Sequence, residues 1–152
     1  MFTLQPYKSS DAPLLQGIFS KQELAKYTNR GGYKILSLFG VYKSQFMLLK
    51  RDEQLVGCGV IRRKYSRDIR RRSWWLYAIW IHPDHRGHGY GSILMEKLLC
   101  ALRNLHAKQV YLVVANDNLR AQNLYKKVGF TLYQQQSKDK ILCYELYTLF
   151  HA

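Results

Sequence analysis

The sequence predicts an α/β fold with a mixed sheet, and three of its segments support this fold class. An almost continuous apolar run, Ser73 to Ile81, is followed by an amphipathic segment, Gly89 to His106, and by a second apolar run, Val110 to Ala115. A strand, a helix and a strand in this order form a βαβ unit with parallel strands and a right-handed crossover. Antiparallel hairpin patterns lie on both sides of the unit, so the sheet is mixed and flanked by helices.

Turn signals and apolar spacing predict the elements of the N-terminal half. Ser9 to Pro13 is rich in residues that begin helices, and Arg51 to Gln54 is a turn between two strand-like runs. In chain order we expect a strand at Phe2–Tyr7, a helix beginning at Ser9–Pro13, a short helix at Gln22–Tyr27, a segment compatible with helix or strand at residues 33–44, and the strands of a hairpin at Phe46–Lys50 and Leu55–Tyr65.

The C-terminal half carries the clearest patterns. Ser73 to Ile81 is expected to be a central strand because both of its faces are apolar. The helix that follows has one apolar face, formed by Ile93, Leu94, Leu98, Ala101, Leu102 and Leu105, with Met95 and Leu99 beside it. Gly129 is expected to end a later helix. The remaining elements are that helix at Asn118–Val128 and two strands at Phe130–Gln135 and Ile141–Leu149.

Length and composition favour one folded domain. A chain of 152 residues, 47% of them hydrophobic, can build one core, so we expect a single domain over residues 1–152. It has no apolar run of about 18 residues and no signal-peptide pattern, which indicates a soluble, cytoplasmic protein with no membrane partner. The three cysteines, Cys58, Cys100 and Cys143, are expected to be reduced, buried thiols.

A glycine-rich loop, residues 86–91, is the first candidate for chemistry. It reads Arg-Gly-His-Gly-Tyr-Gly and joins a buried strand to the start of the best-defined helix. Free N–H groups and the positive end of the helix dipole hold phosphate at such a position. The spacing matches neither the dinucleotide fingerprint nor the P-loop. The alternative is a tight turn that merely requires glycine.

A second motif follows one strand later, where residues 118–130 read Asn-Leu-Arg-Ala-Gln-Asn-Leu-Tyr-Lys-Lys-Val-Gly-Phe. Together with the glycine-rich loop it resembles the GNAT superfamily of N-acetyltransferases, in which Arg/Gln-x-x-Gly-x-Gly precedes the pyrophosphate-binding helix and Asn-x-x-Ala-x-x-Leu-Tyr-x-Lys-x-Gly-Phe marks the next helix and strand. The resemblance covers residues 80–130, and the first 45 residues agree only in general layout. The specified positions present here are Arg86, Gly89, Gly91, Asn118, Ala121, Leu124, Tyr125, Lys127, Gly129 and Phe130.

The resemblance implies a GNAT-like fold with a partly splayed central sheet and acetyl-CoA between two parallel strands. Its pyrophosphate would lie on the amides of residues 86–91, and its pantetheine arm would pair with the backbone of residues 79–81 like an added strand. Asn118 is expected either to contact coenzyme A or only to cap its helix. The implied cofactor-binding residues are Ile79, Trp80, Ile81, Arg86, Gly87, His88, Gly89, Tyr90, Gly91, Ser92, Asn118 and Tyr125.

Tyr125 is the candidate catalytic residue. In direct transfer an amine attacks the thioester carbonyl, and coenzyme A leaves as a thiolate that a phenol can protonate. A free tyrosine has a pKa of about 10 and a thiol about 8.5, so the transfer is uphill unless Lys126, Lys127 or the site lowers the tyrosine.

No general base and no metal site are evident. Many relatives place a glutamate on the strand that here reads Trp74 to Ile81, which has no acid; Asp84 and Glu96 look like solvated positions. His82, His85 and His88 are spaced like zinc ligands, but the glycine loop already explains the segment, so no metal is expected.

The predicted function is therefore acetyl transfer from acetyl-CoA to a primary amine of an unidentified acceptor, either a small molecule or a protein. The alternatives are a basic nucleic-acid-binding module and a coenzyme A-binding module without turnover. Nucleic acid is not favoured as a partner, although 24 Lys plus Arg against 10 Asp plus Glu give a formal charge of +14 that attracts anions.

The densest charge, residues 62–72, is predicted to form the tip of a long hairpin between two strands. It is either a solvated hairpin whose like charges discourage edge-to-edge aggregation or a surface that recruits an anionic acceptor. Because strands alternate faces, its cations divide between the two sides of the sheet. They are Arg62, Arg63, Lys64, Arg67, Arg70, Arg71 and Arg72.

Overall fold

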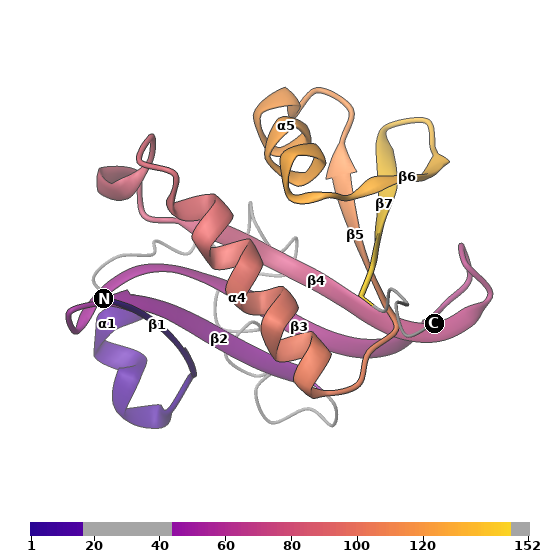
Figure 1. The fold of residues 1–152 in the computed structure, drawn as a ribbon. Coiled ribbons are helices and arrows are strands. Elements are labelled where there is room, and N and C mark those ends of the chain that lie inside the picture. Colours follow the sequence, from indigo (N-terminus) through magenta and orange to yellow (C-terminus); the bar gives the residue numbers. More distant parts are fainter. Residues whose placement is uncertain (17–43, 147–152) are drawn as a thin grey trace, which may run out of the picture.

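The computed structural model describes residues 1–16 and 44–146. Its strands join into one seven-stranded sheet of order β1-β2-β3-β4-β5-β7-β6, in which only β4 and β5 are parallel (Figure 1). The elements are β1 (Phe2–Pro6), a 3₁₀ turn (Ser9–Asp11), α1 (Ala12–Gln16), β2 (Ser44–Arg51), β3 (Gln54–Ser66), β4 (Arg71–Ile81), a 3₁₀ turn (Pro83–His85), α4 (Tyr90–Asn104), β5 (Gln109–Ala115), α5 (Leu119–Val128), β6 (Thr131–Gln135) and β7 (Asp139–Glu145).

The predicted βαβ unit is present, and its two strands diverge. β4 and β5 pair only at Trp74 with Val110 and at Trp75 with Tyr111. Beyond these pairs β4 continues to Ile81 beside β3, while β5 leans away and pairs with β7 (Figure 1). The sheet is therefore splayed at the carboxyl ends of its two parallel strands, as the resemblance implied.

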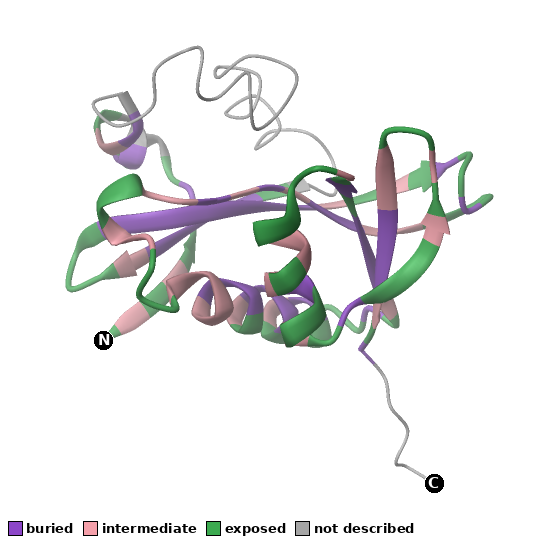
Figure 2. Ribbon diagram, turned by 90° about the horizontal axis from the view of Figure 1, so that it is seen from above, coloured by how far each residue is buried: buried purple, intermediate pink, exposed green. Residues whose placement is uncertain are grey.

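Helix α4 covers one face of the sheet beside β1, β3 and β4. Figure 2 shows its buried residues on the side that faces the strands and exposed residues on the other side. The buried face is Leu94, Met95, Leu98, Leu99 and Leu102. Ile93 and Ala101 of the predicted apolar face are half-buried, and the prediction was wrong for Leu105, which is 40% exposed and lies beyond the last helical residue, Asn104.

An irregularity in β4 was not predicted. Cys58 pairs with Trp80 but Val60 pairs with Tyr77, so Ala78 and Ile79 together oppose Gly59, and Ala78 adopts a φ of 53°. Such a bulge changes which face the following side chains reach. As a result Ile79 and Ile81 pack with the core under α4, whereas Trp80 packs in the cluster on the opposite face.

Most other boundaries agree with the sequence. The hairpin of β2 and β3 is present, with Asp52 and Glu53 as its two turn residues, and Gly129 ends α5 as expected. The predicted helix at 22–27, almost all of the ambiguous segment at 33–44, and the end of the last strand, 147–149, lie outside the described residues.

Cys58 and Cys143 are buried, but Cys100 is exposed, so the prediction of buried thiols was wrong for Cys100, on the outer side of α4. No helix in the described part of the chain is long and apolar enough to cross a membrane.

The buried thiol of Cys58 makes the free energy of unfolding depend on pH in the alkaline range. The thiol donates a hydrogen bond to the Ala78 carbonyl oxygen at 3.7 Å, and complete burial raises its pKa from about 9 to about 12. Between these values the native state keeps a proton that the unfolded chain loses, so the free energy of unfolding falls as pH rises from about 9 to 12. The slope for one such proton is about 1.4 kcal/mol per pH unit.

Urea unfolding at pH 8, 9, 10 and 11 measures this slope. In Cys58→Ala the free energy of unfolding should fall less steeply with pH, by the slope of about 1.4 kcal/mol per pH unit that one proton contributes. Cys100→Ala, at an exposed position, should leave the slope unchanged. An unaltered slope in Cys58→Ala would contradict the assignment.

Candidate active site

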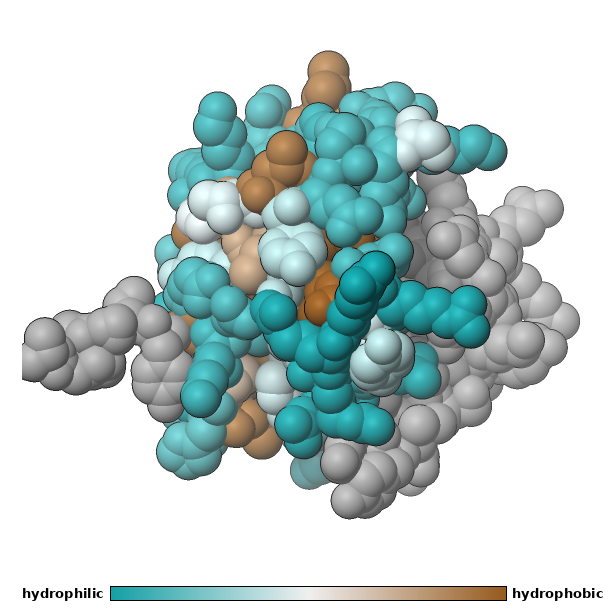
Figure 3. All heavy atoms as spheres, turned by 90° about the vertical axis from the view of Figure 1, so that its right-hand side faces the viewer, coloured by the Kyte–Doolittle hydropathy of each residue, from teal (hydrophilic) through white to brown (hydrophobic). Residues whose placement is uncertain are grey.

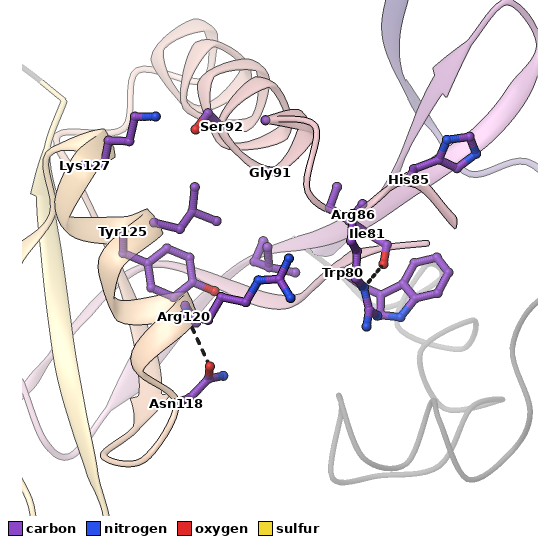
Figure 4. Close-up of a pocket in the computed structure, with 14 residues that line it drawn as sticks. Trp80, Ile81, His85, Arg86, Gly91, Ser92, Asn118, Arg120, Tyr125 and Lys127 are labelled. Carbon is purple, nitrogen blue, oxygen red and sulfur yellow. Dashed lines mark hydrogen bonds between the residues drawn. The ribbon is translucent and has the colours of Figure 1, made fainter. Parts of the chain in front are cut away.

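A cavity of about 430 Å³ lies where β4 and β5 diverge (Figure 4). Three parts of the chain surround it: the end of β4, the loop into α4 with the first turn of that helix, and one face of α5. The lining residues are Ile79, Trp80, Ile81, His85, Arg86, Gly89, Gly91, Ser92, Asn118, Arg120, Ala121, Leu124, Tyr125 and Lys127.

The start of α4 gives the cavity an anion-binding end. Gly89 is the N-cap with a φ of 79°, and it provides no side-chain cap for the first N–H groups of the helix. These groups lack intrahelical partners, and the helix dipole adds partial positive charge at the same end. Arg86, Arg120 and Lys127 also line the cavity, and none of its described lining residues is acidic. The cavity therefore suits a ligand with phosphate groups.

Arg86 connects the loop to β4. Its Nε donates a hydrogen bond to the Ile81 carbonyl oxygen at 2.8 Å, which is drawn as a dashed line in Figure 4. That carbonyl belongs to the stretch expected to pair with pantetheine, so a ligand arm pairing there would have to share or displace Arg86. The loop itself is held by the Asp84 N–H, which donates to His82 Nδ1 at 3.0 Å.

Tyr125 reaches the cavity from α5, and Figure 4 shows its ring and the Arg120 side chain extending into the same space. The ring packs against Phe130 with centroids 5.9 Å apart. Burial raises the pKa of Tyr125 to about 12. Lys126 and Lys127 do not reverse this effect, so the phenol is a neutral hydrogen-bond donor throughout the physiological range.

Asn118 caps α5, and its contact with coenzyme A stays a prediction. Its Oδ1 accepts a hydrogen bond from the Ala121 N–H at 3.2 Å, which caps α5. The same residue lines the cavity. The cap fixes the start of α5 and with it the direction in which Tyr125 and Arg120 project.

Three of the predicted contact residues lie outside the cavity lining. Gly87 and His88 are exposed. The Tyr90 hydroxyl accepts a hydrogen bond from Arg51, and its ring packs edge-on against Phe2 with centroids 4.9 Å apart, so it joins α4 to β1 and β2.

Of the residues weighed as bases or metal ligands, only His85 lines the cavity. Asp84 and Glu96 are exposed, as expected, and neither lines the cavity. His82 packs with the rings of Trp80 and His85, and the described residues contain no cluster of three side chains suited to a metal ion.

Sequence reasoning did not assign five lining residues to the site. Four of them lie on α5, but only Ala121 lies three residues after Asn118 and four before Tyr125, so helical spacing from the predicted residues would have found Ala121 alone. The fifth, His85, lies in the 3₁₀ turn between β4 and α4. The five are His85, Arg120, Ala121, Leu124 and Lys127.

The splayed parallel strands, with the N-terminus of α4 at their open end, form a site whose shape and charge suit an extended, phosphate-bearing ligand. The profile of the acetyltransferase (GNAT) family matches residues 14–130, and the chain belongs to this family.

The individual relatives agree with this family. Mycothiol acetyltransferase of Geodermatophilus obscurus is 43% identical over 56 residues, which cover 37% of this chain and 18% of that protein. An uncharacterised N-acetyltransferase of Mycobacterium bovis is 31% identical over 83 residues, 55% of this chain and 50% of that one. The chain thus spans half or less of these curated relatives.

Among solved structures, spermidine N-acetyltransferase from Vibrio cholerae in complex with CoA and spermine has a TM-score of 0.76 at 19% identity, covering 95% of each chain. This likeness confirms the predicted fold class.

Proposed function

We propose that the protein transfers an acetyl group from acetyl-CoA to a primary amine. The observation that carries the proposal is the cavity of about 430 Å³ between the diverging strands, with the α4 N-terminus at one end and Tyr125 on its wall. Membership of the GNAT family supports the same activity.

Different lining residues would bind the donor and assist the chemical step. The first N–H groups of α4, with Arg86, Arg120 and Lys127, would hold the phosphates of the donor. Acetyl-CoA supplies the acetyl group as a thioester. The amine attacks its carbonyl carbon, a C–N bond forms as the C–S bond breaks, and the sulfur gains a proton while the amine loses one. Tyr125 would donate its hydroxyl proton in a hydrogen bond to the leaving sulfur.

The experiment is a panel of amines with acetyl-CoA, in which release of free thiol is measured. The panel contains amino acids, peptides with free N-termini, aminoglycosides and polyamines. Thiol release that depends on an amine supports acetyl transfer. Binding of coenzyme A without release for any amine would instead indicate a binding module without turnover, and strongly salt-dependent binding of nucleic acid alone would indicate the nucleic-acid module.

We further propose that the acceptor is anionic. Register places Arg62 opposite Trp75 and Lys64 opposite Ser73 on the face of the sheet away from α4, where the Lys64 Nζ lies 4.9 Å from the Trp75 ring centroid. These cations attract a carboxylate- or phosphate-bearing amine and repel a polyamine.

A polyamine is the second candidate acceptor, and a specific observation favours it. A cavity of about 480 Å³ beside the first one shares His85 with it and contains Asp52, Glu53 and Asp84. Carboxylates are the partners that a polycation requires. The Vibrio cholerae neighbour was solved with spermine.

Removing the charges of Arg62 and Lys64 distinguishes these acceptors. Arg62→Gln with Lys64→Gln should raise the KM of an anionic acceptor about tenfold and weaken its salt dependence, with little effect on coenzyme A affinity. Arg67→Gln with Arg70→Gln, at the hairpin tip, removes equal charge and serves as the control. Efficient acetylation of spermine by the unmodified protein, insensitive to salt, would overturn the anionic acceptor and favour the polyamine.

A further inference from the structure

A second basic cavity lies at the other end of α4. It has a volume of about 490 Å³, within the range of small-molecule sites, and shares no residue with the cavity that contains Tyr125. The 15 residues of α4, about 22 Å of helix at 1.5 Å per residue, separate the two. The cavity is lined by Arg63, Arg71, Arg72, Ser73, Trp74, Leu105, His106, Ala107, Lys108 and Gln109.

Sheet register and the end of α4 bring these residues together. Arg63 pairs with Trp74 and Arg72 pairs with Tyr65, so both arginines lie on the face covered by α4. At the end of the helix, His106 has a φ of 61°, and the Ala107 N–H donates to the Leu102 carbonyl oxygen at 3.0 Å. This turn directs the chain back to β5 and places Lys108 beside the hairpin.

The charge of the cavity is uncompensated. Within residues 1–16 and 44–146, the side chains of Arg63, Arg72 and Lys108 have no hydrogen-bond or ion-pair partner. Arg71 differs, because it donates to Tyr111 and Gln109. None of the described residues that line the cavity is acidic, and the carboxylate nearest in the hydrogen-bond network, Glu145, accepts from Gln109 Nε2 at 2.8 Å.

The side of the molecule at the end of the β3–β4 hairpin is also polar. Figure 3 views the molecule from the side where the β3–β4 hairpin ends, and the most hydrophilic residues gather at the centre of this face. Trp74 and Leu105 add apolar surface inside the cavity. The site thus combines several cations with a small apolar wall.

We propose that this cavity binds a small organic or inorganic anion that carries at least two phosphate charges. Like charges in one cavity repel one another, and an anion with several oxygens removes that repulsion while giving Arg63, Arg72 and Lys108 charge-assisted hydrogen bonds. The planar guanidinium group of an arginine can donate two parallel hydrogen bonds to a phosphate, and the two arginines on one face provide two such groups. The site is separate from acetyl transfer and does not depend on it.

Inorganic pyrophosphate is the probe, titrated calorimetrically into the full chain with and without saturating coenzyme A. We expect one site that remains when coenzyme A is bound. Arg63→Gln with Arg72→Gln should weaken it by about tenfold or more. Arg67→Gln with Arg70→Gln removes two cations of the same hairpin outside the cavity lining and should change it by less than about twofold. Circular dichroism checks that both variants fold.

Three outcomes would overturn the proposal. One is no pyrophosphate binding to the coenzyme A-saturated protein, and another is an equal loss in both double variants, which indicates nonspecific attraction. The third is much tighter binding of a single-stranded oligonucleotide than of pyrophosphate, lost in Arg63→Gln with Arg72→Gln, which would identify an extended nucleic-acid surface.

Discussion

Tyr125→Phe is expected to lower the turnover number of acetyl transfer by roughly 10² to 10³, the usual effect of losing one hydrogen-bond donor to charge that develops in the transition state. Fold and coenzyme A affinity should be retained, since phenylalanine preserves the ring that packs against Phe130. Turnover is measured where chemistry limits the rate, and coenzyme A affinity by calorimetry. The matched control is Tyr133→Phe, an exposed tyrosine on β6 outside the cavity.

The pKa of Tyr125 adds a second test of the same residue. A phenol with a pKa of about 12 stays protonated up to about pH 11, so its ionisation should not reduce turnover below that pH. Full proton transfer to a thiolate of pKa about 8.5 would be uphill by about 5 kcal/mol, so a strong hydrogen bond to the sulfur is the expected contribution. Unchanged turnover in Tyr125→Phe would leave the residue as packing or as a contact to the donor.

Gly89→Val is expected to weaken coenzyme A binding by about 100-fold. The new side chain would stand at the N-terminus of α4, on the cavity wall, where phosphate is expected to approach the backbone. It would also strain a backbone with a φ of 79°. Calorimetric titration of coenzyme A measures the change.

Gly87→Val separates the two causes. Gly87 has a φ of 81° and no neighbour within 4 Å of an added Cβ, as at Gly89, but it does not line the cavity. Equal losses in both variants would mean that loop strain, and not blocked approach, weakens binding. Unchanged affinity in a folded Gly89→Val would place the coenzyme A site elsewhere.

The helices and strands of the C-terminal half could be predicted from the sequence because the spacing of apolar residues within each segment specifies them. The βαβ unit followed from alternating strand and helix periods, and Asn118 and Gly129 marked the limits of α5. The bulge at Ala78 and Ile79 could not be predicted in this way. It arises from pairing with Gly59, where an added Cβ would lie 2.9 Å from Leu98 and 3.0 Å from Ile79, and that approach of α4 is a tertiary contact.

The candidate site shows the same division. The glycine loop and Tyr125 were recognisable because the motifs place them at fixed spacing. The upward shift in the pKa of Tyr125 could not be predicted from the sequence, because it results from burial that only the packed structure defines. The hydrogen bond from Arg86 to Ile81 depends likewise on how the loop folds back over β4.

The short β4–β5 ladder divides the sheet into two leaves, β1 to β4 and β5 to β7. Only two residue pairs connect the leaves, and the rings of Trp75 and Tyr111, with centroids 5.2 Å apart, brace that junction. The ladder can therefore act as a hinge, at which a small rotation changes the width of the cavity with little loss of inter-strand hydrogen bonding. A ligand arm bridging both leaves would lock this rotation, so bound donor should slow amide hydrogen exchange well beyond the residues that it touches.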